Sequence, residues 1–119
     1  MADYDRNWAR VDLDAVPHIE ATPPGPKSRE MHARAADIMK GYSGQVKLFP
    51  VCFESGHGVT LRDIDGNEYI DFSSGIYVTN LGHCHPKVSE AVARAAKTLM
   101  NCHDFTTPLK LRLLEKLID

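Results

Sequence analysis

The chain has 119 residues, a formal net charge of −2 and a charged fraction of 25%, which suit a single domain of ordinary composition. This balance lacks the basic surface that nucleic-acid binding requires, and no stretch reaches the ~20 apolar residues that span a bilayer, so we expect neither a nucleic-acid nor a membrane partner. The polar start, Met1–Arg6, does not resemble a secretory leader, and three cysteines without paired spacing are typical of reduced thiols; the sequence therefore predicts a soluble, cytoplasmic protein.

The first part of the chain combines an irregular arm, a proline-rich connector and a helix. Residues 1–21 show mixed charge and little periodicity, and we interpret them as an N-terminal arm that is ordered only where it docks, with Trp8 as its one large anchor. The prolines of Thr22–Pro26 predict an extended connector. Ser28 is expected to cap a helix through about Lys40, because apolar residues recur on one helical face at Met31, Ala35, Ile38 and Met39.

The middle of the chain predicts a small antiparallel sheet. A short apolar strand is expected at Val51–Phe53. Residues Thr60–Phe72 predict a β-hairpin, because two runs of strand-forming residues flank Asp65-Gly66, a dipeptide that favours a tight two-residue turn. Ser73-Ser74-Gly75 then breaks the strand, and a short apolar run, Ile76–Val78, follows it.

Two helices are predicted in the last third of the chain. The first starts at Pro86, which suits a first helical turn, and continues to about Met100 with one apolar stripe. The second, Leu109–Asp119, opens at Thr107-Pro108 and is rich in leucine. Because this helix reaches the last residue without a cap, we expect the chain to be the truncated part of a longer protein.

Several polar clusters suggest chemistry but have a simpler interpretation. His83-Cys84-His85 and Cys102-His103 contain zinc-ligand types, yet they are adjacent or alternate and lack the usual ligand spacing. We therefore favour loop-forming roles over a metal site, and beyond the neighbouring histidines we see no local evidence for a cysteine nucleophile. The three aspartates of the hairpin lack the register of a calcium loop and are interpreted as turn or strand-edge residues: Asp63, Asp65 and Asp71.

The combined pattern resembles a known enzyme family. Asp63–Ile76 reads D-x-D-G-N-E-Y-I-D-F-x-S-G-I and Gly82–Val88 reads G-H-x-H-P-K-V, a combination that closely resembles the N-terminal part of the class III aminotransferases. Thr22–Lys27 most resembles the branch of 4-aminobutyrate aminotransferases and amino-acid racemases. The resemblance implies that residues 22–119 are an α+β segment, with an N-terminal helix, a small antiparallel sheet and two helices, of the pyridoxal-5′-phosphate (PLP)-dependent transferase fold type I, which is an α/β fold.

The same resemblance implies which residues meet the substrate. Ile76 follows the Ser-Gly pair and is implied to face the substrate side of the PLP pocket, with Tyr77 as a further lining residue. Val46 matches a family position whose side chain, often aromatic, also faces the substrate. In the family the cofactor-binding lysine, the aspartate partner of the ring nitrogen and the phosphate-binding segment all lie beyond the G-H-x-H-P helix. None of these motifs occurs here, so we assign no catalytic, cofactor-binding or metal residue to this chain.

By resemblance, the complete enzyme transfers an amino group from an amine or amino acid, such as 4-aminobutyrate or an ornithine-like donor, to a 2-oxo acid through PLP, and it is a homodimer. The chain alone is not expected to be active, because it lacks the lysine. Two alternatives stay open: a PLP-dependent amino-acid racemase of the same family, and a non-catalytic module for oligomerisation or binding.

Overall fold

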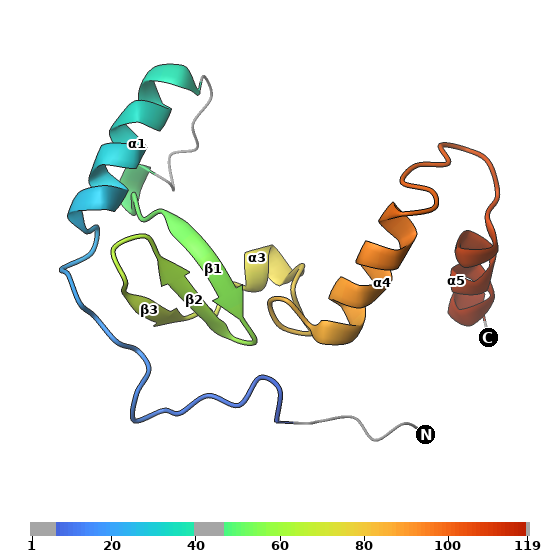
Figure 1. The fold of residues 1–119 in the computed structure, drawn as a ribbon, viewed down its shortest axis with the longest axis horizontal. Coiled ribbons are helices and arrows are strands. Elements are labelled where there is room, and N and C mark those ends of the chain that lie inside the picture. The colour runs from blue at the N-terminus through green and yellow to red at the C-terminus, as the bar shows by residue number, and fades with distance from the viewer. Residues whose placement is uncertain (1–6, 40–46, 119) are drawn as a thin grey trace. The chain divides into compact units, whose positions relative to one another are not determined.

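The computed structural model describes residues 7–39 and 47–118, and the chain divides into two compact units, Met1–His85 and Pro86–Asp119. The first unit contains α1 (Pro26–Ile38), β1 (Phe53–His57), β2 (Thr60–Asp63), β3 (Glu68–Ile70) and the short helical turn α3 (Ser74–Tyr77) (Figure 1). The second unit contains α4 (Pro86–Ala96) and α5 (Pro108–Ile118). This content confirms the predicted combination of an N-terminal helix, a small antiparallel sheet and two C-terminal helices.

The three-stranded sheet is antiparallel, with β2 between β1 and β3. A tight hairpin, closed by the pair His57↔Thr60, joins β1 to β2. The predicted strand at Val51–Phe53 is wrong in its position, because the strand begins at Phe53 and runs on to His57. Its path includes Ser55 and Gly56, small residues that pair by their backbones and leave no hydrophobic signal in the sequence.

The β2–β3 turn is longer than the predicted two-residue turn. Asp63 N–H donates to the carbonyl of Asn67 at 3.0 Å, so Ile64, Asp65 and Gly66 form the loop. Gly66 N–H donates back to the Asp63 carbonyl at 3.1 Å, and Gly66 has a φ of 94°, which glycine adopts without steric cost. The Asp63 carboxylate also accepts the Asp65 N–H at 2.9 Å, and this local bond favours the longer loop.

The Asp63 carboxylate is the centre of this turn. It is fully buried and accepts further hydrogen bonds from the N–H and the Nδ2–H of Asn67, both at 2.9 Å, and from the Tyr69 hydroxyl at 2.7 Å. Burial raises the pKa of the Asp63 carboxyl, but the hydrogen bonds from Tyr69 and Asn67 outweigh burial and hold this pKa below its usual value. Burial and the bond to Asp63 raise the pKa of Tyr69 to about 12. The turn thus encloses a buried anion whose charge is stabilised by hydrogen bonds.

Asn67 connects the turn to the N-terminal arm. Its side chain is fully buried, and its Oδ1 accepts the N–H groups of Glu20 at 2.7 Å and Ala21 at 2.8 Å. Beside it, His18 and Glu68 exchange two backbone hydrogen bonds, at 2.7 and 3.1 Å, so the arm continues the sheet by one bridge. These contacts dock the arm against β3.

Trp8 fixes the earlier part of the arm. The His57 Nε2–H donates to the Trp8 carbonyl at 2.6 Å, and the Trp8 ring meets the ring of His85 edge-on with 4.8 Å between centroids. The chain passes so close to the β1–β2 turn that a Cβ on Gly58 would lie 2.6 Å from the Ala9 Cβ. Trp8 is therefore a docking residue, which agrees with its interpretation as the anchor of the arm.

Helix α1 is capped by the side chain of Asp65 from the β2–β3 turn. The prediction that Ser28 caps this helix is wrong. The helix begins at Pro26, and the Asp65 carboxylate accepts the N–H groups of Lys27 and Ser28, both at 2.8 Å. A negative charge at this end also interacts favourably with the helix dipole. A Cβ on Gly25 would lie 2.2 Å from the Asp65 Cγ, so glycine at the N-cap leaves the space that Asp65 occupies. Ser28 is buried, and its Oγ accepts the N–H of Cys52 at 3.4 Å.

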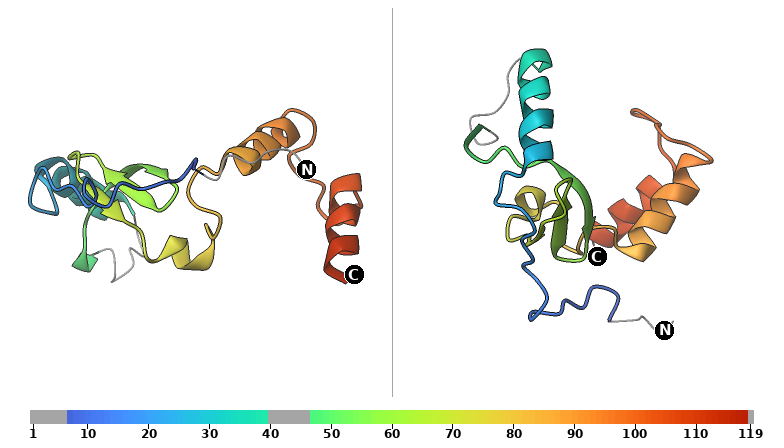
Figure 2. Two further views of the ribbon diagram at one scale, coloured as in Figure 1. Left: turned by 90° about the horizontal axis from the view of Figure 1, so that it is seen from below. Right: turned by 60° about the vertical axis from the view of Figure 1, so that its left-hand side comes forward.

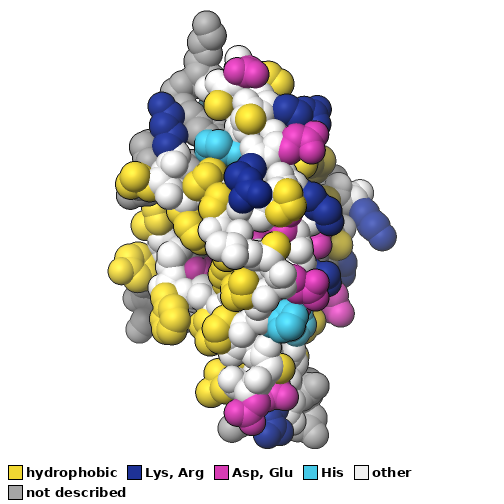
Figure 3. All heavy atoms as spheres, turned by 90° about the vertical axis from the view of Figure 1, so that its left-hand side faces the viewer, with side chains coloured by type: hydrophobic (Ala, Val, Ile, Leu, Met, Phe, Trp, Pro, Cys, Tyr) yellow, Lys and Arg dark blue, Asp and Glu magenta, His cyan; other side chains and the backbone are white. Residues whose placement is uncertain are grey.

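No apolar side chain is buried among the described residues. The fully buried side chains are polar: Ser28, Asp63 and Asn67. Large apolar side chains lie at the surface instead, and Figure 3 shows them on one face of the chain between charged side chains. Directional hydrogen bonds, more than an apolar core, therefore define the fold of the described part of the first unit.

The second unit follows its prediction closely. Helix α4 begins at Pro86 as predicted but ends at Ala96, before the expected Met100, and the residues that follow form a turn in which the N–H groups of Thr98 and Leu99 donate to the Ala95 carbonyl at 3.0 and 2.9 Å. Thr107 caps α5, since its Oγ1 accepts the Lys110 N–H at 3.2 Å. Neither helix has a buried residue, and within residues 7–39 and 47–118 no helix is long and apolar enough to cross a membrane.

Candidate functional site

The loop 72–82 leaves the sheet and returns to it at the tip of the β1–β2 hairpin. Asp71 N–H donates to the Val59 carbonyl at 2.8 Å, and His83 exchanges two backbone hydrogen bonds with Gly58, at 2.8 and 3.0 Å. Gly58 and Val59 are neighbours in the chain, so both ends of the loop are fixed to one place. The loop carries α3, which is yellow in Figure 2 and projects from the green strands.

A carboxylate and an imidazole join the two ends of this loop. The His83 Nε2–H donates to Asp71 Oδ2 at 2.7 Å, and the two side chains are 21% and 7% exposed, respectively. Asp71 Oδ1 accepts the N–H groups of Ser73 at 2.8 Å and Ser74 at 3.0 Å. The bond from His83 lowers the pKa of the Asp71 carboxyl; burial opposes this, and the two backbone N–H groups add to the lowering. Asp71 is therefore an ionised acceptor at neutral pH.

The α3 turn is left-handed. Its four residues all have positive φ: 51° at Ser74, 60° at Gly75, 60° at Ile76 and 65° at Tyr77. Such angles cost an L-residue roughly 1–2 kcal/mol each, and a β-branched residue such as Ile76 adopts them rarely. The Ser74 and Thr79 hydroxyls share a hydrogen bond of 2.9 Å that closes the turn. Backbone strain of this kind is concentrated at functional sites, so the turn is our candidate site.

Two of the three residues that the sequence places at the substrate lie on this turn. Ile76 and Tyr77 are each 78% exposed, so their side chains are available to a ligand or to another surface. Val46, the third, lies outside the described residues. The structure thus brings Ile76 and Tyr77 together, and their role toward a substrate stays a prediction.

Sequence reasoning missed the residues that hold the turn. Asp71 was interpreted as a strand-edge residue and His83 as a loop residue, and their pairing has no local signature because 12 positions separate them. The bonds from the backbone N–H groups of Ser73 and Ser74 to Asp71 do have one, since an aspartate side chain often accepts the backbone N–H two residues further along the chain and so favours a turn. Recognising that pattern would have identified Asp71 as the residue that shapes the loop.

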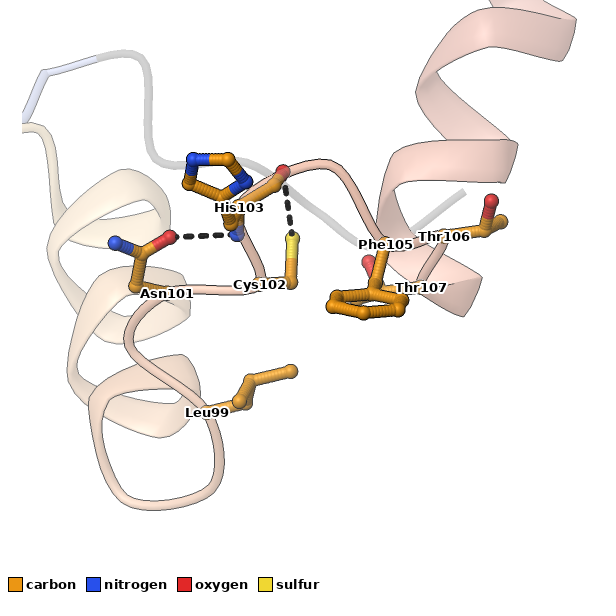
Figure 4. A pocket seen from close by; sticks show the side chains of 7 residues that line it. All are labelled: Leu99, Asn101, Cys102, His103, Phe105, Thr106 and Thr107. Atoms are coloured by element: carbon orange, nitrogen blue, oxygen red, sulfur yellow. Dashed lines mark hydrogen bonds between the residues drawn. The ribbon is translucent and has the colours of Figure 1, made fainter.

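The clusters considered for other chemistry contain no assembled site. No group of three or more metal-ligating side chains comes together in the part of the chain that the structure describes. His103, one of the candidate ligands, has its Nδ1 3.0 Å from the Asp104 carboxylate, and all three cysteines are free thiols. The linker between α4 and α5 lines an open pocket of about 530 Å³ with Leu99, Cys102 and Phe105 among its walls (Figure 4). No lysine, arginine or carboxylate lines this pocket, and we assign it no function.

The described residues do not fit a covalent PLP site. PLP chemistry requires a lysine amine to bind the cofactor, an acid for its ring nitrogen and donors for its phosphate. Every lysine in the described part of the chain is exposed, and none lies on the loop 72–82: Lys27, Lys47, Lys87, Lys97, Lys110 and Lys116. Among the described residues, therefore, no lysine lies in an enclosed site that could hold the cofactor covalently.

Comparisons with known proteins place the chain in a family. The family model described as aminotransferase class III matches residues 42–119. An acetylornithine aminotransferase of Methanocaldococcus jannaschii is 42% identical over 86 residues, which are 70% of this chain and 21% of that protein. An alanine/serine racemase of Pyrococcus horikoshii is 33% identical over 111 residues, 92% of this chain and 23% of that protein. The chain thus spans about a fifth of the length of these relatives.

Solved structures agree with the sequence comparison. A transaminase with PLP bound matches with a TM-score of 0.67 and 34% identity, over 76% of this chain and 22% of that one. Plasmodium falciparum ornithine delta-aminotransferase matches with a TM-score of 0.66 and 30% identity, over 76% of this chain and 24% of that one. The fold predicted from the sequence, a segment of the PLP-dependent transferase fold, is confirmed by these structures. The chain therefore belongs to the class III aminotransferases, a PLP-dependent family.

Proposed function

We propose that this chain forms the N-terminal part of an enzyme that transfers an amino group from an amine or amino acid to a 2-oxo acid. The observation that carries this proposal is the left-handed α3 turn, which exposes Ile76 and Tyr77 next to the family's D-x-D-G-N-E-Y-I-D pattern. A strained turn that lies on a hydrogen-bonded base is the arrangement expected of a substrate-contacting loop.

The donor that we propose carries its amino group on a methylene chain, such as 4-aminobutyrate or an ornithine-like molecule. Ile76 offers apolar contact to methylene groups and no hydrogen bond to a polar group. The names of the relatives support this class, because they include acetylornithine and ornithine aminotransferases. The resemblance of Thr22–Lys27 to the 4-aminobutyrate branch supports the same class of donor.

Within this enzyme the chain has a binding and orienting role. Ile76 and Tyr77 contact the substrate, and Val46 is the third residue that we place at its side. PLP, when bound by the lysine and phosphate-binding residues of the remaining enzyme, supplies the chemistry of amino transfer. We propose a homodimer in the cytoplasm; the free thiols of Cys52, Cys84 and Cys102 support a reducing compartment.

A transfer assay tests the proposal. The full-length protein that carries this sequence is loaded with PLP, and amino acid formed from 2-oxoglutarate is measured with 4-aminobutyrate, ornithine and N-acetylornithine as donors. Turnover of at least one donor that depends on the 2-oxo acid supports the proposal. Lack of transfer from every donor, with PLP bound at one site per chain, contradicts it.

A racemase of the same family is the second candidate, because the Pyrococcus relative, which matches 92% of this chain, is an alanine/serine racemase. Chiral chromatography distinguishes the two: a racemase interconverts L- and D-alanine or serine without a 2-oxo acid. The third candidate is a non-catalytic module. In that case the 119-residue chain alone unfolds cooperatively, and the full-length protein shows neither amino transfer nor racemisation.

A further inference from the structure

Packing does not hold the left-handed turn in the described part of the chain. The large apolar side chains of the loop 72–82 are all mostly exposed: Phe72 91%, Ile76 78%, Tyr77 78%, Val78 80% and Leu81 66%. A run of four positive φ angles persists only where its surroundings over-determine it. Within the described residues, the polar contacts at the base of the loop are therefore the ones that can supply that restraint.

Asp71 restrains the first end of the turn. Its Oδ1 accepts two successive backbone N–H groups, those of Ser73 and of Ser74, which is the first left-handed residue of the turn. The direction of these two N–H groups sets how the chain enters the turn. A carboxylate is suited to this task, because one oxygen can accept both bonds while the other remains available.

His83 restrains Asp71. Its Nε2–H donates to the second oxygen of Asp71 at 2.7 Å, and its backbone is paired on both sides with Gly58. A Cβ on Gly56 would lie 3.0 Å from the His83 Cγ, so the imidazole rests directly against β1. Contacts from β1 to His83, from His83 to Asp71 and from Asp71 to the turn thus fix the turn relative to β1.

We propose that Asp71 and His83 are positioning residues that hold Ile76 and Tyr77 toward the substrate. Without their hydrogen bond, Ser73 and Ser74 lose a fixed acceptor, and the turn relaxes to negative φ angles that Ile76 prefers. This role rests on the proposed function, because it gives the turn a substrate to face. Asp71 acts on the substrate only through the turn and does not contact it.

Nuclear magnetic resonance of the full-length protein, labelled selectively at isoleucine, tyrosine and asparagine, tests the geometry independently of activity. A strong intraresidue NOE between the amide proton and Hα reports a positive φ at Ile76 and Tyr77. We expect this NOE to be lost in Asp71→Asn and in His83→Ala. We expect it to be retained in His83→Gln, because the glutamine amide keeps an N–H donor near the position of Nε2.

The matched control for the carboxylate is Asp12→Asn, since Asp12 Oδ1 accepts the N–H of Asp14 at 3.0 Å in an exposed turn of the N-terminal arm. This variant should leave the Ile76 NOE unchanged. Amide exchange of Asn67 should also stay slow in all variants, which shows that the hairpin remains folded. Retention of the Ile76 NOE in Asp71→Asn would overturn the proposal.

Kinetics of the PLP-loaded full-length protein provide the second readout. Asp71→Asn and His83→Ala should raise KM for the amino donor about tenfold while kcat changes less, and His83→Gln should restore KM. An NOE lost without any change of KM overturns the positioning role. If the wild-type protein transfers no amino group, the proposed function fails, and the NOE alone still decides whether Asp71 and His83 hold the turn.

Discussion

Among the described residues up to His85, the fully buried side chains are Ser28, Asp63 and Asn67, and each is hydrogen-bonded to backbone or side-chain partners. From Pro86 to Ile118, by contrast, no described residue is buried, and the leucines of α5 are between 48% and 71% exposed. The first unit has its conformation specified by directional polar contacts. The second has two regular helices whose apolar faces are uncovered within the described chain.

The difference shows what each kind of interaction can specify. A hydrogen bond fixes a distance and a direction, so Asp63, Asp65 and Asp71 can each define a turn or a helix start without a hydrophobic core. An apolar helix face is non-directional and specifies only that some surface covers it. Apolar faces of this extent are characteristic of surfaces that pack against other protein.

The largest effect is expected from Asp63→Ala. This change leaves the Asn67 amide groups and the Tyr69 hydroxyl without their acceptor, and unsatisfied buried donors cost ~1–3 kcal/mol each before relaxation. We expect amide exchange at Ala21 and Asn67 to lose about 3 kcal/mol of protection. Glu54→Ala is the control, because its pair with Arg62 is exposed and long, at 3.7 Å, and should contribute less than ~0.5 kcal/mol. Equal losses of protection in Asp63→Ala and Glu54→Ala would show that the buried carboxylate stabilises the unit no more than an exposed one does.

Acid should weaken the first unit before the second. Asp63, Asp65 and Asp71 all have a pKa below the ordinary value, so their folded-state pKa lies below the unfolded one. Their contribution is therefore complete above the unfolded pKa, near 3.8, and is lost as the pH falls through the lower folded values. Tyr69 has the opposite sign: its pKa of about 12 adds stability that is lost only as the pH rises through that value. Circular dichroism and amide exchange between pH 2 and 7 (about the range of carboxyl titration) measure this. If the amides of α4 and α5 lost their protection from exchange at a higher pH than the hairpin amides, this prediction would be contradicted.

Alanine substitutions at two matched glycines distinguish the effect of backbone strain from the effect of displacing the N-terminal arm. Gly58 and Gly75 have nearly equal φ, 56° and 60°, so alanine at either costs about 1 kcal/mol from the backbone. At Gly58 the new Cβ would also lie 2.6 Å from the Ala9 Cβ, whereas at Gly75 the nearest atom is the Val78 Cβ at 3.9 Å. Gly58→Ala should therefore displace the arm and change Trp8 fluorescence, and Gly75→Ala should not. The same fluorescence change in both variants would show that the arm does not contact Gly58.

The smallest effect on stability is expected in α5. Leu113 is 58% exposed, so Leu113→Lys should change the exchange of the first unit by less than ~0.5 kcal/mol. The same change should reduce self-association in sedimentation experiments, because it places a charge on an apolar face. Arg112→Lys serves as the control of unchanged charge. A loss of protection at Asn67 in Leu113→Lys would contradict the division into two units.

Local patterns predicted the elements whose causes are local. The helices at Pro86 and Pro108 follow from proline and apolar periodicity, and the hairpin follows from strand-forming residues on both sides of Asp65-Gly66. The cap of α1 could not be found in this way, because Asp65 reaches Lys27 from 38 positions away. The length of the β2–β3 turn depends on which backbone N–H groups donate to the Asp63 carboxylate, and residue types alone do not reveal this.

Family resemblance named two residues of the candidate turn, and their role toward a substrate stays a prediction. Ile76 and Tyr77 were named from the Ser-Gly-Ile pattern. Their left-handed backbone could not be predicted locally, because Ile76 is β-branched and such residues disfavour positive φ. The restraint that permits it comes from His83, across the whole loop. Val46 falls outside the described residues, and its role remains a prediction.

The most direct measurement is the donor profile of Ile76→Gln in the PLP-loaded full-length protein. Ile38→Gln is its matched control, because Ile38 on α1 is 76% exposed and Ile76 is 78% exposed. We predict that Ile76→Gln shifts the ratio of kcat/KM between 4-aminobutyrate and a more polar donor about tenfold with PLP content unchanged, whereas Ile38→Gln leaves the ratio as in the wild type. An Ile76→Gln profile equal to that of the wild type within error would contradict the assignment of the α3 turn to the substrate.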